Sequence, residues 1–209
     1  MKATILGGDL DSLTGDERCL YTVSVDPSGM REGSILAGFE WVKRTFRNVT
    51  PLIGDGPLIE RTARITGADP ELVERRALVL SDRLPGAVLM SRLVLDEDFT
   101  RAMERVSAAT TTCAGFREGI DEEAGAYVAR VARRGGLAIK AEEAARISRE
   151  YIELEVAMYL CMASRGWLVD VYVGRELNIL KRFIAQEFGL LLSPLERRVF
   201  IGLEGETAT

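Results

Sequence analysis

The hydrophobic and polar positions of the chain follow two alternating patterns. Short apolar runs rich in β-branched and aromatic residues predict five strands, at residues 19–25, 49–54, 88–94, 167–173 and 198–203. Longer stretches with apolar residues at helical spacing predict helices at residues 31–47, 69–84, 96–120, 122–133, 140–163 and 177–188. Because strands and helices alternate, we expect a layered α/β fold with a mostly parallel, five-stranded sheet.

Length and composition indicate one domain. The chain has 209 residues, 47% of them apolar and 28% charged, so we expect a single domain over residues 1–209 with a loose tail at 204–209. The N-terminus lacks the apolar run of a signal peptide, and no run approaches the roughly 18 apolar residues of a membrane span. These features predict a cytoplasmic protein that does not bind membranes. The net charge of -5 means that any nucleic-acid site must be local.

The composition also excludes several kinds of chemistry, because the chain has no histidine. Serine-histidine and cysteine-histidine nucleophile pairs and histidine-ligated metals are therefore ruled out. The three cysteines are odd in number and far apart, which argues against a zinc site. No glycine-rich phosphate loop occurs, and the acidic runs at residues 96–98 and 121–123 are interpreted as helix starts. We expect neither a metal nor a cofactor.

Candidate catalytic residues lie where ligands bind in parallel sheets, beyond the carboxyl ends of the strands. Ser24 ends the first predicted strand and precedes a helix, whose backbone N–H groups could stabilise an oxyanion. Tyr151 and Glu155 are four residues apart, so they share one helix face and suit an ammonium group. Tyr172 lies near the end of the fourth strand. The alternatives are an ordinary strand end, an amphipathic helix and a core tyrosine.

Several of these stretches together resemble one family, the tRNA-dependent cyclodipeptide synthases. The resemblance is carried by residues 21–25, 39–46, 51–55, 151–155 and 169–172, and needs no gap from Ser24 through Trp41 to Asp55. It implies a Rossmann-like, three-layer fold similar to the catalytic domains of class I tyrosyl- and tryptophanyl-tRNA synthetases. It also implies an enzyme that uses aminoacyl-tRNA as acyl donor, without ATP or metal.

The resemblance further implies a role for each candidate. Ser24 would accept an aminoacyl group from one charged tRNA, and a second charged tRNA would give a dipeptidyl-enzyme that cyclises to a diketopiperazine. Tyr151 and Glu155 would hold the amino group, and Tyr172 would assist proton transfer. The residues on or near the aminoacyl pocket would be Leu20, Thr22, Pro27, Leu52, Gly54, Leu93, Met158, Asp170 and Gly174. Arg75, Arg76 and Arg83 would contact the tRNA.

This chemistry fits a chain without histidine, because an aminoacyl-tRNA is already an activated ester and positioning supplies much of the rate. Family members usually have glycine and asparagine where this chain has Thr22 and Pro27, and a more basic tRNA-binding helix. Two alternatives therefore stay open: transfer to another small amine or hydroxylamine, and a non-catalytic binding module on the same fold. Asp170 predicts a basic or hydrogen-bonding side chain in the pocket, unless it faces water at a sheet edge. We expect a monomer or a weak dimer.

Overall fold

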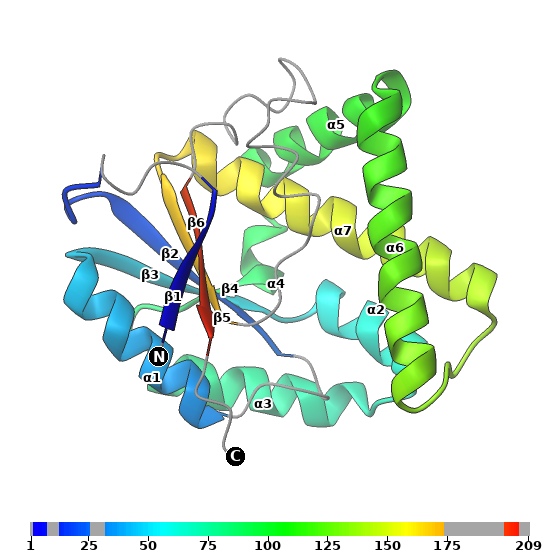
Figure 1. Ribbon diagram of the computed structural model, residues 1–209, viewed down its shortest axis with the longest axis horizontal. Coiled ribbons are helices and arrows are strands. Elements are labelled where there is room, and N and C mark those ends of the chain that lie inside the picture. The colour runs from blue at the N-terminus through cyan, green and yellow to red at the C-terminus, as the bar shows by residue number, and fades with distance from the viewer. Residues whose placement is uncertain (1, 8–12, 26–31, 174–198, 205–209) are drawn as a thin grey trace.

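The computed structural model describes residues 2–7, 13–25, 32–173 and 199–204, which form a layered α/β fold (Figure 1). Within these residues, six strands make one sheet in the order β1-β6-β5-β2-β3-β4. The strands are β1 (Lys2–Gly7), β2 (Arg18–Ser24), β3 (Asn48–Gly54), β4 (Val88–Leu89), β5 (Val169–Val173) and β6 (Val199–Glu204). All the pairings among β2 to β6 are parallel, and β1 pairs antiparallel with β6.

The predicted count of five strands was wrong because it omitted β1. This short strand lies at the edge of the sheet, where its pairing with the distant strand β6 holds it in place, and that contact is not visible in the local sequence pattern. The five strands that were predicted are all present and all parallel to their sheet neighbours among β2 to β6. Glu204, expected in the loose tail, is the last residue of β6.

Seven helices accompany the sheet in the described part of the chain: α1 (Glu32–Thr45), α2 (Pro57–Thr66), α3 (Pro70–Arg83), α4 (Met90–Leu93), α5 (Glu97–Thr112), α6 (Ala114–Arg134) and α7 (Ala141–Ser164). The helix predicted to start at Asp69 is confirmed, and the Asp69 side chain accepts a hydrogen bond from the Glu71 backbone N–H at 3.0 Å. Helix α2 was not predicted. The helix expected at residues 177–188 lies outside the described residues. None of the described helices is long and apolar enough to cross a membrane.

Two predicted boundaries were wrong. The strand expected at residues 88–94 stops after Leu89, because the buried Asp55 carboxylate accepts hydrogen bonds from Ser91 N (2.8 Å) and Ser91 Oγ (2.6 Å). The Asp55 carboxylate thus acts as the acceptor for a backbone N–H in the first turn of α4, where no intrahelical acceptor is available. The break between α5 and α6 falls at Cys113, whose backbone is extended, rather than near residue 121.

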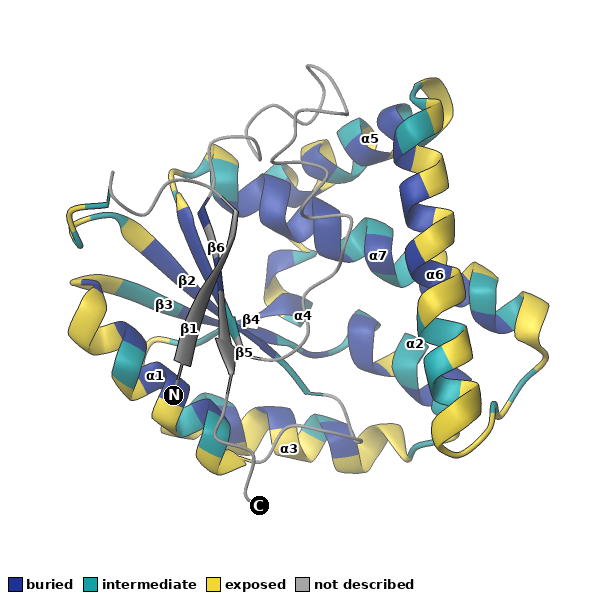
Figure 2. Ribbon diagram, viewed as in Figure 1, coloured by how far each residue is buried: buried dark blue, intermediate teal, exposed yellow. Residues whose placement is uncertain are grey.

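Two apolar clusters hold the layers together, one on each face of the sheet. Helices α1 and α3 pack on one face through residues such as Phe39 and Leu80. Helices α4, α5 and α7 cover the other face, together with parts of α2 and α6. Every residue from 155 to 162 of α7 is buried, so the C-terminal part of α7 crosses the interior of the molecule (Figure 2). The polar side chains of that segment can only face other protein groups or an enclosed site.

Candidate active site

The site is built where the strand order reverses. From β2 the sheet continues to β3 and β4 on one side, and to β5 and β6 on the other. Such a switch point leaves a crevice at the carboxyl ends of the two central strands. Ser24 is the last residue of β2 and pairs with Gly54, while Thr22 pairs with Tyr172 of β5. The candidate nucleophile therefore lies at the expected edge of the sheet.

Strand alternation places the candidate residues on a single face. In β2, Tyr21 and Val23 pack in the cluster below α1 and α3, and Leu20 packs in the cluster beside α7. Because successive side chains point to opposite faces, Thr22 and Ser24 also face α7. In β5 the same alternation turns Val169 and Val171 toward α1 and turns two candidate residues toward α7: Asp170 and Tyr172.

Helix α7 brings Tyr151 to Ser24. The two side chains share a hydrogen bond, and the Tyr151 phenol also interacts electrostatically with Glu155 and Tyr172. Burial is the main reason why the pKa of Tyr151 is raised well above 10, and Glu155 and Tyr172 add to the rise. Tyr151 is therefore a neutral phenol at physiological pH. It can donate or accept a hydrogen bond, but it is not a base.

Glu155 lies one turn further along α7 and is buried. Its Oε2 atom has no hydrogen-bond partner among the residues that the structure describes. Burial raises the pKa of this carboxyl group from 4.5 to about 8, and the nearby carboxylates of Asp170 and Glu123 contribute to the rise. The group is consequently protonated near neutral pH until a cation approaches it.

Asp170 and Thr22 form a buried polar pair between β5 and β2. The Thr22 Oγ1 hydroxyl donates a hydrogen bond of 2.5 Å to Asp170 Oδ1. Asp170 is only 1% exposed, and β5 lies inside the sheet between β6 and β2. The alternative that Asp170 faces water at a sheet edge is therefore wrong.

The apolar residues expected around the aminoacyl pocket gather on the same side of the sheet. One cluster beside α7 contains all four of them: Leu20, Leu52, Leu93 and Met158. Gly54 leaves little spare room, because a Cβ atom there would come within 3.1 Å of Leu58 Cδ1. Pro27 and Gly174 lie outside the described residues.

One carboxylate of this region was misread from the sequence. Glu123 was interpreted as part of a helix start, but it lies in the middle of α6 and is buried. With Tyr127 and Ser148 it lines a cavity of about 20 Å³ beside Tyr151. Its spacing of three residues from Ile120, on the buried stripe of α6, was the signal that could have identified it. For residues 96–98 the same interpretation is correct, because the Asp96 side chain caps α5.

The arginines expected to contact tRNA lie elsewhere. Arg75, Arg76 and Arg83 are on α3, which packs on the sheet face opposite to the Ser24 side chain, and Arg83 forms an ion pair with Glu32. The segment 127–140 has three arginines, one lysine and no acidic residue.

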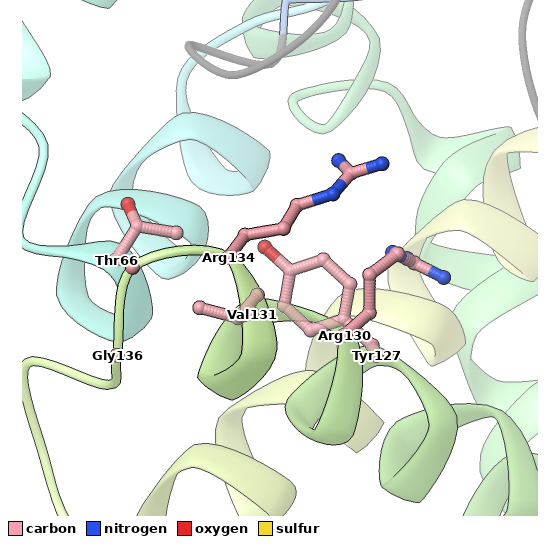
Figure 3. A pocket seen from close by; sticks show the side chains of 7 residues that line it. Thr66, Tyr127, Arg130, Val131, Arg134 and Gly136 are labelled. Atoms are coloured by element: carbon pink, nitrogen blue, oxygen red, sulfur yellow. The ribbon is translucent and has the colours of Figure 1, made fainter.

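That basic segment borders a cavity. The cavity measures about 190 Å³ and its lining includes Arg130, Arg134, Tyr127 and Thr66. The Arg130 guanidinium lies 5.1 Å from the centre of the Tyr127 ring. In Figure 3 the side chains of Tyr127, Arg130 and Arg134 project from α6, with Thr66 of α2 across from them. Tyr127 also lines the small cavity beside Tyr151, so it connects the 190 Å³ cavity to the candidate site.

Fold and site together define a Rossmann-like α/β protein with a serine at its switch point. No protein-family model matches the chain, and no curated protein matches its sequence. Solved structures do match. A cyclodipeptide synthase from Bacillus thermoamylovorans has a TM-score of 0.73 at 16% identity, over 99% of this chain and 96% of that one. One from Fluoribacter dumoffii has a TM-score of 0.72 at 16% identity, over 96% and 97%.

A further match links this fold to the synthetases. A Mycobacterium tuberculosis protein with a TM-score of 0.64 and 15% identity, over 90% of this chain and 84% of that one, is described as demonstrating that cyclodipeptide synthetases are related to type I tRNA synthetases. The chain therefore has the fold of the cyclodipeptide synthases, as a sequence-divergent example, and the resemblance found in the sequence is confirmed at the level of the fold.

Proposed function

We propose that this protein is a tRNA-dependent cyclodipeptide synthase, which joins the aminoacyl groups of two charged tRNAs into a diketopiperazine. The observation that carries the proposal is the hydrogen bond between Ser24, at the switch point, and Tyr151, on the same helix as the buried Glu155. A nucleophile, a neutral hydrogen-bonding phenol and a carboxyl group suited to an ammonium group meet at one edge of the sheet. The solved cyclodipeptide synthases share this fold.

The protonation states of Tyr151 and Glu155 favour an activated ester as the substrate. The raised pKa values of Tyr151 and Glu155 leave both side chains neutral near pH 7, so neither is a strong base toward the Ser24 hydroxyl. An ester has a much better leaving group than an amide, and needs mainly positioning and oxyanion stabilisation. Aminoacyl-tRNA supplies such an ester together with an α-ammonium group for Glu155.

The first step forms the aminoacyl-enzyme. Ser24 Oγ attacks the ester carbonyl carbon of the bound aminoacyl-tRNA, and the new Oγ–C bond replaces the bond to the terminal ribose oxygen. The serine proton goes to that ribose oxygen, directly or through Tyr151, and the tRNA leaves. Glu155 binds the α-ammonium group, which lowers the pKa of the carboxyl group and lets it ionise.

Two further steps form the ring. The amine of the serine-bound aminoacyl group attacks the ester of a second aminoacyl-tRNA, which forms a peptide bond and releases the second tRNA with the amine proton. The new terminal amine then attacks the ester carbonyl at Ser24. The second amide bond closes the ring, the Oγ–C bond breaks, and the proton returns to Ser24. We assign the relay of the amine protons to Glu155 and Tyr172, which both lie close enough to Tyr151 to raise its pKa.

A second candidate function keeps the first step and changes the acceptor. Thr22 stands where family members usually have glycine, and its hydroxyl is committed to Asp170, so the floor of the site is polar. That change favours a different small nucleophile, such as an amine or a hydroxylamine, for the serine-bound aminoacyl group. The two candidates differ in product and agree on the aminoacyl-Ser24 intermediate.

The tRNA partner needs cationic contacts, and we place them at the basic segment of α6. Arg130 and Arg134 line the 190 Å³ cavity, which Tyr127 connects to the small cavity beside Tyr151. Helix α3, by contrast, balances Arg75, Arg76 and Arg83 with three acidic residues: Glu71, Glu74 and Asp82. Phosphate contacts supply most of the affinity of proteins for nucleic acids.

The test is a labelling experiment. The protein is incubated with a panel of radiolabelled aminoacyl-tRNAs, precipitated and counted, and the small-molecule products are identified by mass spectrometry. We expect protein-bound label in the wild type and in the control Ser107→Ala, which changes an exposed serine of α5, and none in Ser24→Ala. Label that persists in Ser24→Ala would remove Ser24 as nucleophile. A complete lack of label from every tRNA would favour the binding module.

A further inference from the structure

The cavity at the C-terminal end of α6 combines an aromatic and apolar wall with a cationic one. Tyr127 and Val131 form the first, and Arg130 and Arg134 form the second. The Arg130 guanidinium lies over the Tyr127 ring, 5.1 Å from the ring centre (Figure 3). Because a guanidinium stacks through its plane and donates hydrogen bonds through its edge, Arg130 can contact a flat ring and an anion at the same time.

Two glycines leave this cavity open on one side. Gly135 and Gly136 both line it, and a Cβ atom added at either position would meet no atom of the other described residues within 4 Å. The volume of about 190 Å³ is below the roughly 300 Å³ at which pockets for whole drug-sized ligands begin. The cavity therefore suits one planar ring system that enters from the open side, while the groups attached to that ring stay outside.

Only one further side chain, Tyr151, lies between Tyr127 and the candidate nucleophile. Tyr127 lines both the 190 Å³ cavity and the small cavity beside Tyr151, and it interacts electrostatically with the Tyr151 phenol. Tyr151 is in turn hydrogen-bonded to Ser24. A ligand whose ring stacks at Tyr127 therefore needs only a short spacer between that ring and the group that reacts at Ser24.

We propose that the 190 Å³ cavity binds the terminal nucleobase of the aminoacyl-tRNA, the adenine of its unpaired 3′ end, by stacking against Tyr127 and Arg130. This inference rests on the proposed function and names the part of the tRNA that the cavity recognises. The ester of an aminoacyl-tRNA is on the ribose of the same nucleotide, so this ribose is the spacer between the stacked base and Ser24. Arg134 and the edge of Arg130 contact the phosphate groups of that strand.

The lining of the cavity favours a base over a bare phosphate group. A phosphate group is held by cations and N–H donors, and gains nothing from the Tyr127 ring or from Val131. Unpaired RNA bases stack on aromatic rings and on guanidinium planes, and one such contact raises affinity by roughly 5- to 150-fold. The paired bases of a tRNA are stacked inside their own helices, so the single-stranded 3′ end is the part that can enter.

The test measures the binding of uncharged tRNA and so requires no acyl transfer. One tRNA has an intact 3′ end, and the other has an abasic nucleotide in place of the terminal adenosine, with the same ribose and phosphates. We expect wild type to bind the intact tRNA at least about 5-fold more tightly. Gly135→Leu fills the cavity and should erase this preference. Gly125→Leu is the matched control, because it adds the same side chain at an exposed position of α6 that does not line the cavity, and it should keep the preference.

Gly135 is the better position to fill, since the φ of +89° at Gly136 disfavours a side chain. Two changes at Tyr127 then test the stacking itself. Tyr127→Phe keeps the ring and should keep the preference for intact tRNA, whereas Tyr127→Leu removes the ring and should lose it. Equal affinity of wild type for the two tRNAs would overturn the inference, as would a preference that survives both Gly135→Leu and Tyr127→Leu.

A free nucleotide is the other source of the same chemistry. Calorimetry with adenosine 5′-monophosphate on wild type and Gly135→Leu identifies it: binding that the variant abolishes, together with equal affinity for the two tRNAs, would overturn the inference in favour of a free nucleotide. The labelling experiment fails independently of this one. A base preference without label from any aminoacyl-tRNA would reject the proposed transfer and retain the base site, and label without a base preference would do the reverse.

Discussion

The side-chain hydroxyl groups of Ser24 and Tyr151 are hydrogen-bonded to each other across the space between β2 and α7. Neither group is near its own ionisation at physiological pH, so the bond serves to orient the serine and to offer a route for its proton. The sheet supplies the nucleophile and the buried helix supplies its partner. The geometry of this pair therefore depends on how α7 packs against the sheet.

Replacing Tyr151 by phenylalanine should slow the formation of the acyl-enzyme. The ring keeps its packing, but Ser24 loses its orienting partner, and we expect the single-turnover labelling rate to fall by about 10- to 100-fold. Tyr21→Phe is the matched control, because the Tyr21 hydroxyl donates to the Ile35 carbonyl on the opposite face of the sheet. That control should lose about 1 kcal/mol of stability and keep its labelling rate. Equal rates in Tyr151→Phe and wild type would remove Tyr151 from the mechanism.

Glu155 should make the free protein less stable as the pH rises. The unfolded carboxyl group releases its proton near its ordinary pKa of 4.5, and the folded one near about 8. Between these values the folded state holds a proton that the unfolded state has lost, so the free energy of unfolding falls with rising pH. Glu155→Gln removes this dependence. As the pH rises between these two values, the free energy of unfolding of the variant should increase relative to that of wild type. We expect this relative increase to reach about 2–4 kcal/mol above about pH 8.

Urea denaturation of both proteins at about pH 5 and about pH 9 measures this gain. The same variant should fail to form the aminoacyl-enzyme, because the amide cannot become the anion that holds the α-ammonium group. A stability difference that is the same at both pH values would contradict the raised pKa of Glu155.

The salt dependence of tRNA binding should locate the phosphate contacts. Removing one phosphate contact lowers the slope of log affinity against log salt by about 0.7 to 0.9. We expect Arg130→Ala/Arg134→Ala to lower the slope by about 1.4 to 1.8, and Arg75→Ala/Arg76→Ala to lower it less. Arg47→Ala is the control, since Arg47 directly precedes the amino end of β3. It therefore lies at the end of the sheet away from the candidate site, which is at the carboxyl ends of the strands. A larger effect from the α3 pair would return the tRNA site to the helix that the family resemblance suggested.

Asp55 should be among the most costly acidic residues to remove. Its buried carboxylate accepts hydrogen bonds from both the N–H and the hydroxyl of Ser91, so Asp55→Ala leaves two half-buried donors without this acceptor, at a cost of about 2–4 kcal/mol. Asp69→Ala removes an exposed helix cap instead and should cost about 1 kcal/mol. The comparison is made by urea denaturation, and equal losses would show that α4 does not depend on the Asp55 contacts.

Much of the site could be predicted because it depends on local patterns. The end of a β-branched strand identified Ser24, and a spacing of four residues put Tyr151 and Glu155 on one face of a helix. For Thr22 and Asp170 the expectation came from the family resemblance, and the structure shows that strand alternation puts both on the same face as Ser24. These features depend on the side-chain period of two residues in strands and of 3.6 residues in helices, and both periods can be recognised in a single sequence.

The features that were missed depend on distant contacts. Strand β1 is held by β6, almost 200 residues away in the chain. Strand β4 stops early because Asp55, 36 residues before Ser91, caps the next helix. Glu123 stands in a run of three acidic residues, which is usual for an exposed helix start, and only the packing of α6 on α7 buries it. Tertiary packing overrode the local signal in each case.

The pairing of β1 with β6 also has a consequence for synthesis. The first strand made must wait for the last one, and the Thr22 to Asp170 hydrogen bond spans 148 residues. Closing such distant contacts is slow compared with forming local helices. The face of the sheet that carries Thr22, Ser24 and Asp170 is therefore assembled late in folding, after the helices that lie between β2 and β5 in the chain have formed.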